Sequence, residues 1–293
     1  MMAAENRNDE LKNHRRVRLL LIILLLLLRI PYVILITYFT PIEDHVSGSV
    51  YEASTYLLTA ALIWWERNQL ADFHMDTAAL IFIVVFRPLQ TLILNYWGVS
   101  SPLAFPKPAS FIIWAISIGL VAALWRGGFR PARLQNINIR WLGVGALLGL
   151  TVSVCENLKP FLSALNNSHI QAAQFSSMLA STGMIFLYHL GFAPLNEEPL
   201  FRGFLWGTLR QMKWKEIWIW LFQAVLFTLA HIYFAGQYPL LFWVYIPGAG
   251  LLLGWLAWRS RSISAGILAH AMINASTYVI ALSLLLILLR LFQ

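Results

Sequence analysis

Long apolar runs recur along the chain and constrain its fold more than any other feature. They begin at Val17 and continue to the C-terminus, separated by short polar or basic segments. The chain is 59% hydrophobic and 12% charged, whereas an ordinary soluble domain carries about 25% charged residues. A run of about 20 apolar residues crosses the hydrocarbon core of a bilayer. The sequence therefore predicts an all-α, polytopic membrane bundle with about eight or nine transmembrane helices.

The basic residues predict the orientation of this bundle. The formal charge is +8, but Lys and Arg sit in short clusters between apolar runs, which is typical of membrane topology and not of nucleic-acid binding. Clusters in the tail at 1–16 and between Arg126 and Arg140 indicate the cytoplasmic side. No small-residue cleavage site follows the first run, so we expect a retained anchor. We expect a multi-pass integral protein of the plasma (inner) membrane with its N-terminus cytoplasmic.

Three features of the N-terminal half are interpreted structurally. Arg29 interrupts the first apolar run and is expected to pair inside the bundle or to snorkel, without a chemical role. A set of small residues in a later run is expected to let helices approach closely: Gly143, Gly145 and Gly149. The lone Cys155 excludes an internal disulfide and any multi-cysteine metal site.

Two adjacent acids and an arginine stand out in the apolar C-terminal half. On a helix, Glu198 and Arg202 are four residues apart, with the acid on the N-terminal side, which favours an ion pair. Glu197 lies about 100° around the helix and has no such partner. One alternative is a solvated helix start with Asn196 as the N-cap. In a membrane bundle, however, Glu197 is expected to meet another group across the fold.

Two later segments supply candidates for that group. His231 lies in an apolar run, and His270 and Asn274 are spaced i and i+4, so they share one face of a helix. Taken singly, each is more typical of helix packing. Glu197 and His231, however, are each seventeen residues from Trp214, at the centre of the intervening loop. In an antiparallel hairpin both would lie roughly 25 Å from the turn, at about the same depth.

These residue types suit hydrolysis. A carboxylate and an imidazole that share a water can remove its proton as it attacks a carbonyl carbon. His270 and Asn274 can donate hydrogen bonds to the oxyanion that develops. Glu197, His231 and His270 could instead be zinc ligands, although His-Glu-x-x-His is absent and Asn274 suits an oxyanion better than zinc. We expect no cofactor, with zinc as the alternative.

The three segments resemble the CPBP family, which comprises the CAAX proteases and bacteriocin-processing enzymes also called Abi. The resemblance rests on Glu197-Glu198-x-x-x-Arg202, Phe227-x-x-x-His231 and His270-x-x-x-Asn274 and covers Pro194 to Thr277. It implies that Glu197, assisted by His231, activates water, that His270 and Asn274 form the oxyanion hole, and that Glu198 and Arg202 support the site. Residues 17–156 would then be N-terminal membrane helices, and 157–293 the catalytic membrane core.

The implied activity is that of a CAAX-type intramembrane endopeptidase. Type II CAAX prenyl endopeptidases of this family remove the last three residues of prenylated proteins, and other members process peptides. We therefore expect the bilayer and a membrane-associated or lipid-modified peptide as partners, and no nucleic acid. A proton-coupled transporter would also explain the buried charges, but not Asn274 or the lack of a repeated counterpart. An inactive scaffold of the same fold is the third hypothesis.

Overall fold

The structure is a computed structural model that describes residues 2–32, 34, 45–90, 108–131, 134, 138–156 and 186–275. These parts form helices joined by turns, without a β-strand, which confirms the predicted all-α class. Predicted apolar runs that extend into 35–44, 91–107, 157–185 and 276–293 lie partly or wholly outside the described residues.

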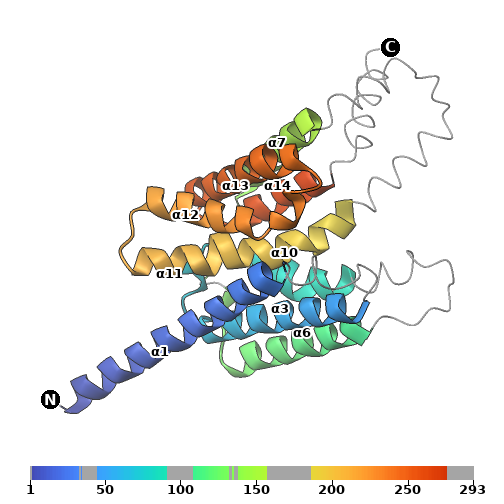
Figure 1. The fold of residues 1–293 in the computed structure, drawn as a ribbon. Helices are drawn as coiled ribbons and strands as arrows, with labels where there is room; N and C mark the ends of the chain where they lie inside the picture. The colour runs from blue at the N-terminus through green and yellow to red at the C-terminus, as the bar shows by residue number, and fades with distance from the viewer. Residues whose placement is uncertain are drawn as a thin grey trace, which may run out of the picture.

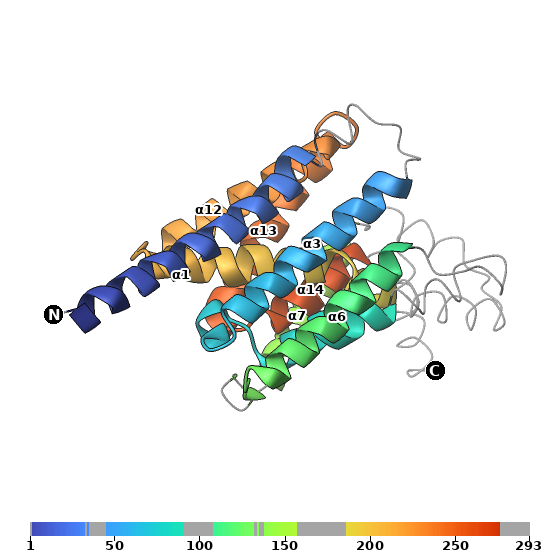
Figure 2. The same ribbon diagram turned by 90° about the horizontal axis from the view of Figure 1, so that it is seen from below.

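The N-terminal half forms a layer of long helices. α1 (Met2–Leu27) includes the predicted tail and ends in a π-helical turn, η1 (Leu28–Tyr32). α3 (His45–Trp65) packs against both α1 and α6 (Pro108–Arg126). Between α3 and α6 lie the 3-10 turn η2 (Leu70–Phe73), α4 (Thr77–Ile81) and the π-helical η3 (Phe82–Phe86). Figure 2 shows α1, α3 and α6 extending in similar directions across this layer.

The C-terminal half carries the adjacent acids Glu197 and Glu198 and the candidate histidines His231 and His270. α10 (Ala193–Glu198), the π-helical η5 (Pro199–Leu205) and α11 (Trp206–Gln211) follow one another as a continuous rod. A turn leads into α12 (Glu216–Leu229), which precedes the 3-10 turn η6 (Ile232–Phe234). η7 (Leu241–Tyr245) and α13 (Ile246–Ser260) come next, and α14 (Ser264–Asn274) packs against α7 (Ile139–Glu156), α13 and α10. Figure 1 shows α10 and α11 between this group and the N-terminal layer.

Several arginines from the basic segments form ion pairs at one end of the bundle. Arg18 bonds Glu66, just beyond α3, with Nη1 and Oε1 3.4 Å apart. Arg210 and Arg261 both bond Glu216, at the start of α12. In Figure 1 the N-terminus and the α11–α12 turn both lie at the left. This clustering agrees with the expectation that the basic segments share one side, whereas their cytoplasmic placement stays a prediction.

The number of membrane-spanning helices also stays a prediction. Among the described helices, one 20-residue stretch, Leu241–Ser260, is long and apolar enough to cross a bilayer, with a mean hydropathy of 1.5. Shorter apolar helical stretches are also present: Thr77–Gln90, Ser110–Arg126, Ile139–Ser153 and Glu216–Leu229. The predicted eight or nine spans are therefore not confirmed.

A buried aspartate fixes the start of the helix that carries His270. Asp76 caps α4 by accepting a hydrogen bond from the Ala79 amide at 2.8 Å, and its carboxylate also accepts from the hydroxyls of Ser262 and Ser264. The Ile263 amide bonds the His74 carbonyl oxygen at 2.9 Å. These bonds link the turn before α4 to the first residue of α14.

Two of the three glycines singled out in the sequence lie at a close helix contact. A Cβ added at Gly145 would come 2.5 Å from the Ala265 carbonyl oxygen, and one added at Gly149 would come 2.5 Å from that of Ala269. Real Cβ contacts are not that short, so α7 can lie this close to α14 only with glycine at both positions. Gly143 has nothing within 4 Å, so close packing does not explain it.

We therefore expect opposite effects from two alanine substitutions in α7. Gly149→Ala should destabilise the protein by about 1–3 kcal/mol, because the methyl group overfills a backbone contact. Gly143→Ala should leave stability unchanged or raise it by up to about 1 kcal/mol, since alanine favours helix and the site is open. Thermal unfolding in detergent measures both. Equal melting temperatures for the two variants would contradict the observed α7–α14 packing.

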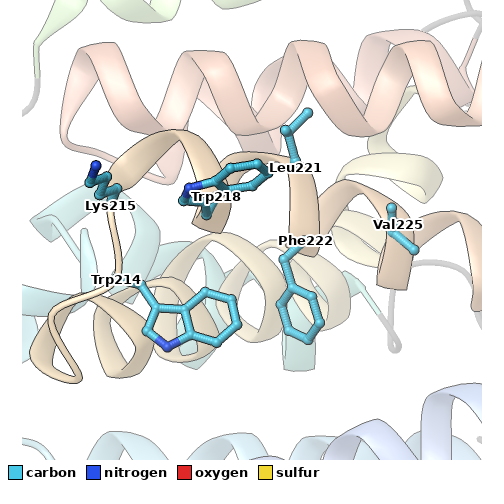
Figure 3. Close-up of a pocket in the computed structure, with 6 residues that line it drawn as sticks. All are labelled: Trp214, Lys215, Trp218, Leu221, Phe222 and Val225. Atoms are coloured by element: carbon cyan, nitrogen blue, oxygen red, sulfur yellow. The ribbon is translucent and has the colours of Figure 1, made fainter.

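The outer side of α12 presents an exposed apolar surface. A hollow of about 440 Å³ lies there, beside the α11–α12 turn, and Figure 3 shows the side chains that line it. The rings of Trp214 and Phe222 lie 5.4 Å apart at this hollow. Its lining contains one cation and no acid or histidine: Trp214, Lys215, Trp218, Leu221, Phe222 and Val225. Such an apolar exterior suits contact with lipid.

Candidate active site

Glu197 and Glu198 lie in a deeply buried helical rod. Pro194 lies in the first turn of α10, where a missing backbone N–H costs little. The residues from Pro194 through Leu209 are all buried. Glu197 is 1% exposed and Glu198 is fully buried. The π-helical η5 that follows is a type of distortion often found at functional sites. The solvated helix start that the sequence left open is therefore wrong.

Glu198 binds two partners through the same oxygen. Its Oε1 accepts from Arg202 Nη1 at 3.1 Å and from His270 Nδ1 at 2.8 Å. Arg202 also donates to the Gly250 carbonyl at 3.2 Å, and its guanidinium lies 4.3 Å from the centre of the Phe227 ring. The predicted Glu198–Arg202 pair is confirmed. The bond from His270 to Glu198 was not predicted.

The other oxygen of Glu198 lies against α14. A Cβ at Gly266 would be 2.8 Å from Glu198 Oε2, so a larger residue there would displace this carboxylate. His270 follows one turn later on the same helix face. The close approach at Gly266 therefore brings His270 within reach of Glu198.

Glu197 meets a charged group across the fold, as expected, although this partner was not identified from the sequence. Its Oε1 accepts a hydrogen bond from Nη2 of Arg29, which lies in η1 at the end of α1. Arg29 Nη1 also donates to the hydroxyl of Tyr51 in α3. The sequence showed Arg29 as a charge inside an apolar run and allowed pairing within the bundle. It gave no means of identifying Glu197 as the partner.

The second oxygen of Glu197 faces both histidines. Glu197 Oε2 is 3.8 Å from His231 Nε2 and 3.9 Å from His270 Nε2. Among the described residues this oxygen has no hydrogen-bond partner. The hairpin prediction that Glu197 and His231 meet at equal depth is confirmed. His231 lies just beyond the end of α12, however, and not inside a continuous helix to Phe234.

Hydrogen bonds assign the tautomers of the two imidazoles. His231 Nδ1 lies 2.8 Å from the Phe227 carbonyl oxygen, which can only accept, so Nδ1 carries the proton. Its Nε2 is then free to accept a proton. His270 Nδ1 donates to the Glu198 carboxylate, so its Nε2 can donate as well when the ring carries both protons. The two histidines therefore suit opposite roles.

A cavity of about 400 Å³ contains these groups. Asn274, at the end of α14, lines it together with Glu197, His231 and His270. The structure thus brings the four predicted catalytic residues to one cavity, with Glu198 and Arg202 directly behind it. Several lining residues were not predicted as site residues: Arg29, Tyr188, His189, Tyr233 and Tyr245. For His189, the available signal was a histidine in an apolar run close to the acid pair.

Two observations speak against the alternative zinc site, which stays a hypothesis. Within the described residues, no group of three or more His, Cys, Asp and Glu side chains is placed to hold a metal ion. The guanidinium of Arg29 also occupies one oxygen of Glu197 and would repel a dication there.

Comparison with known proteins identifies the same part of the chain. A search of curated proteins and a search of solved structures give no match. The family model described as "Type II CAAX prenyl endopeptidase Rce1-like" matches residues 179–276. That segment contains all three motifs and ends two residues after Asn274. The match confirms the resemblance to the CAAX proteases over residues 179–276, the part of the chain that carries the three motifs.

Proposed function

We propose that the protein is a CAAX-type intramembrane endopeptidase that hydrolyses a peptide bond with water activated by Glu197 and His231. The observation that carries this proposal is the position of Glu197 Oε2, which faces the Nε2 atoms of His231 and His270 at 3.8 and 3.9 Å. Polar groups at this separation are too far apart to bond directly but can share a water. His231 Nε2 and Glu197 Oε2 can both accept from that water.

The reaction follows from these roles. The water oxygen attacks the carbonyl carbon of the substrate while Glu197, aided by His231, takes up one of its protons. The carbonyl oxygen becomes an oxyanion, which accepts hydrogen bonds from His270 Nε2–H and the Asn274 side-chain amide. The C–N bond then breaks as the stored proton passes to the leaving nitrogen. Neither a serine nor a thiol nucleophile is required.

Glu198 and Glu197 have different roles in this reaction. Glu198 accepts from His270 Nδ1, so its negative charge stabilises the doubly protonated ring that donates to the oxyanion. Arg202 bonds the same oxygen, Oε1, at 3.1 Å and neutralises the charge of Glu198. Glu197 Oε2 instead has no hydrogen-bond partner among the described residues and faces the two histidines that line the cavity. One acid therefore positions the oxyanion hole, and the other acts as the base.

The proposed substrate is a membrane-associated or lipid-modified peptide cut near one end. The name of the matched family refers to prenyl endopeptidases. The apolar exterior of α12 and the mostly apolar lining of the cavity support a substrate that arrives from the bilayer. We further propose a multi-pass protein of the inner membrane with its basic end, including the N-terminus, in the cytoplasm.

Purified protein tests the cofactor and the substrate together. Protein stripped with a chelator is expected to contain no stoichiometric zinc and to cleave at its original rate. A peptide with a lipid group is expected to be cleaved faster than the same peptide without one. A soluble folded protein is expected not to be cleaved. Mass spectrometry identifies the cleaved bond, and elemental analysis measures zinc.

Three outcomes would contradict parts of this proposal. Zinc at one ion per chain, with activity lost on stripping and restored on addition, would overturn the metal-free mechanism. Efficient cleavage of a soluble folded protein would overturn substrate entry from the bilayer. Proton-coupled uptake by reconstituted vesicles, without cleavage of any peptide, would favour the transporter hypothesis.

A further inference from the structure

Arg29 reaches the cavity from outside the matched family segment. It lies in the π-helical turn that ends α1, 168 residues before Glu197 in the chain. Its side chain is 14% exposed and lines the cavity. One terminal nitrogen bonds Glu197 Oε1 and the other bonds the Tyr51 hydroxyl. The N-terminal helices therefore supply a direct contact to the proposed base.

We propose that Arg29 is a positioning residue for Glu197, held in place by Tyr51. This inference rests on the proposed function, because it assigns a role toward the catalytic carboxylate. The last torsion of a glutamate side chain is broad and roughly two-fold, so an unanchored carboxylate samples many orientations. Arg29 binds only the Oε1 atom of Glu197. The other oxygen is thereby kept directed at the two histidines.

The charge of Arg29 has a second consequence. Glu197 is 1% exposed, and an ionised carboxylate at such a site is costly without a cation beside it. Arg202 is bonded to Glu198 instead, at 3.1 Å. Arg29 thus offsets the cost of the negative charge that Glu197 needs to take up a proton from water.

A different role, binding the terminal carboxylate of a substrate, fits these contacts less well. Both terminal nitrogens of Arg29 already donate, to Glu197 and to Tyr51. A substrate carboxylate placed there would compete with the base for the same guanidinium. The two roles differ in kinetics, since loss of positioning lowers kcat, whereas loss of substrate binding raises KM.

The test compares Arg29→Met, Arg29→Lys and Tyr51→Phe in the full-length protein with one cleaved peptide. Arg29→Met is expected to lower kcat by about 10²-fold, as misplacement of a catalytic group by about 1 Å can do, with KM little changed. Arg29→Lys should restore part of the rate, because it returns the charge without the planar fork. Tyr51→Phe keeps the ring and should lower kcat by a smaller factor.

Arg18→Met is the matched control. Arg18 lies on the same helix and bonds a buried glutamate, Glu66, but it is eleven residues, or about 16 Å, from Arg29. This variant should lose stability and keep the kcat of the wild type per folded molecule. If Arg29→Met does not fold, Tyr51→Phe tests the positioning role instead. A kcat equal to that of the wild type in this variant would then contradict that role.

The outcomes separate the two proposals. Wild-type kcat in the folded Arg29→Met protein, with Glu197→Gln inactive, would overturn the positioning role alone. A rise in KM at unchanged kcat, together with loss of preference for a free C-terminal carboxylate over its amide, would overturn it in favour of substrate binding. Full activity of Glu197→Gln would overturn the proposed function itself.

Discussion

Glu197→Gln is expected to lower kcat by about 10² to 10⁴, the usual contribution of a general base. Glutamine keeps the volume of the side chain, and its carbonyl oxygen can still accept from Arg29, but it cannot take up a proton from water. The free energy of unfolding should fall only moderately, because Arg29 retains 14% exposure and its bond to Tyr51. Single-turnover cleavage, normalised to folded protein, measures the effect.

Glu66→Gln is the matched control for this loss. Glu66 is also buried, and it too bonds an arginine, Arg18 of α1, at 3.4 Å. It lies at the basic end and does not line the cavity. The control should therefore lose stability without losing kcat. If Glu66→Gln and Glu197→Gln lowered kcat equally, the rate loss would reflect a broken buried ion pair and not a missing base.

Glu198→Gln is expected to have the largest effect on stability, about 3–5 kcal/mol, as when one partner of a buried ion pair is removed. Both Glu198 and Arg202 are fully buried, so Arg202 would keep its charge without a counter-ion or water. His270 would lose the carboxylate that accepts from its Nδ1. Thermal unfolding in detergent should show a lower melting temperature, and the remaining folded protein should cleave more slowly.

Comparing the stability and kcat of Glu197→Gln and Glu198→Gln shows which acid is the base and which supports the site. A stable but inactive Glu198→Gln, beside an unstable Glu197→Gln, would exchange the roles of base and support. Arg202→Lys provides a second check on the support role. Lysine returns the charge but cannot bond Glu198 and the Gly250 carbonyl through two nitrogens of one planar group. This variant should therefore be intermediate in stability.

The sequence by itself determined the features that depend on local spacing. Glu198 and Arg202 pair because residues four apart share one side of a helical rod. His270 and Asn274 line one cavity for the same reason. The meeting of Glu197 with His231 followed from equal distances to a turn, which needs only a helix rise and an antiparallel hairpin. Low charge and apolar runs were enough for the all-α class.

Only the tertiary structure decided the contacts between distant segments. The sequence showed that Arg29 and Glu197 were charges in apolar surroundings, but a pair separated by 168 residues depends on which helices become neighbours. The bond from His270 to Glu198 depends on the close approach of α14 at Gly266, which no periodicity specifies. Local spacing fixes which residues share a face of a helix, whereas packing fixes what that face meets. The fold thus bound one oxygen of Glu197 to Arg29 of η1 and left the other facing two histidines, without a hydrogen bond to any described residue.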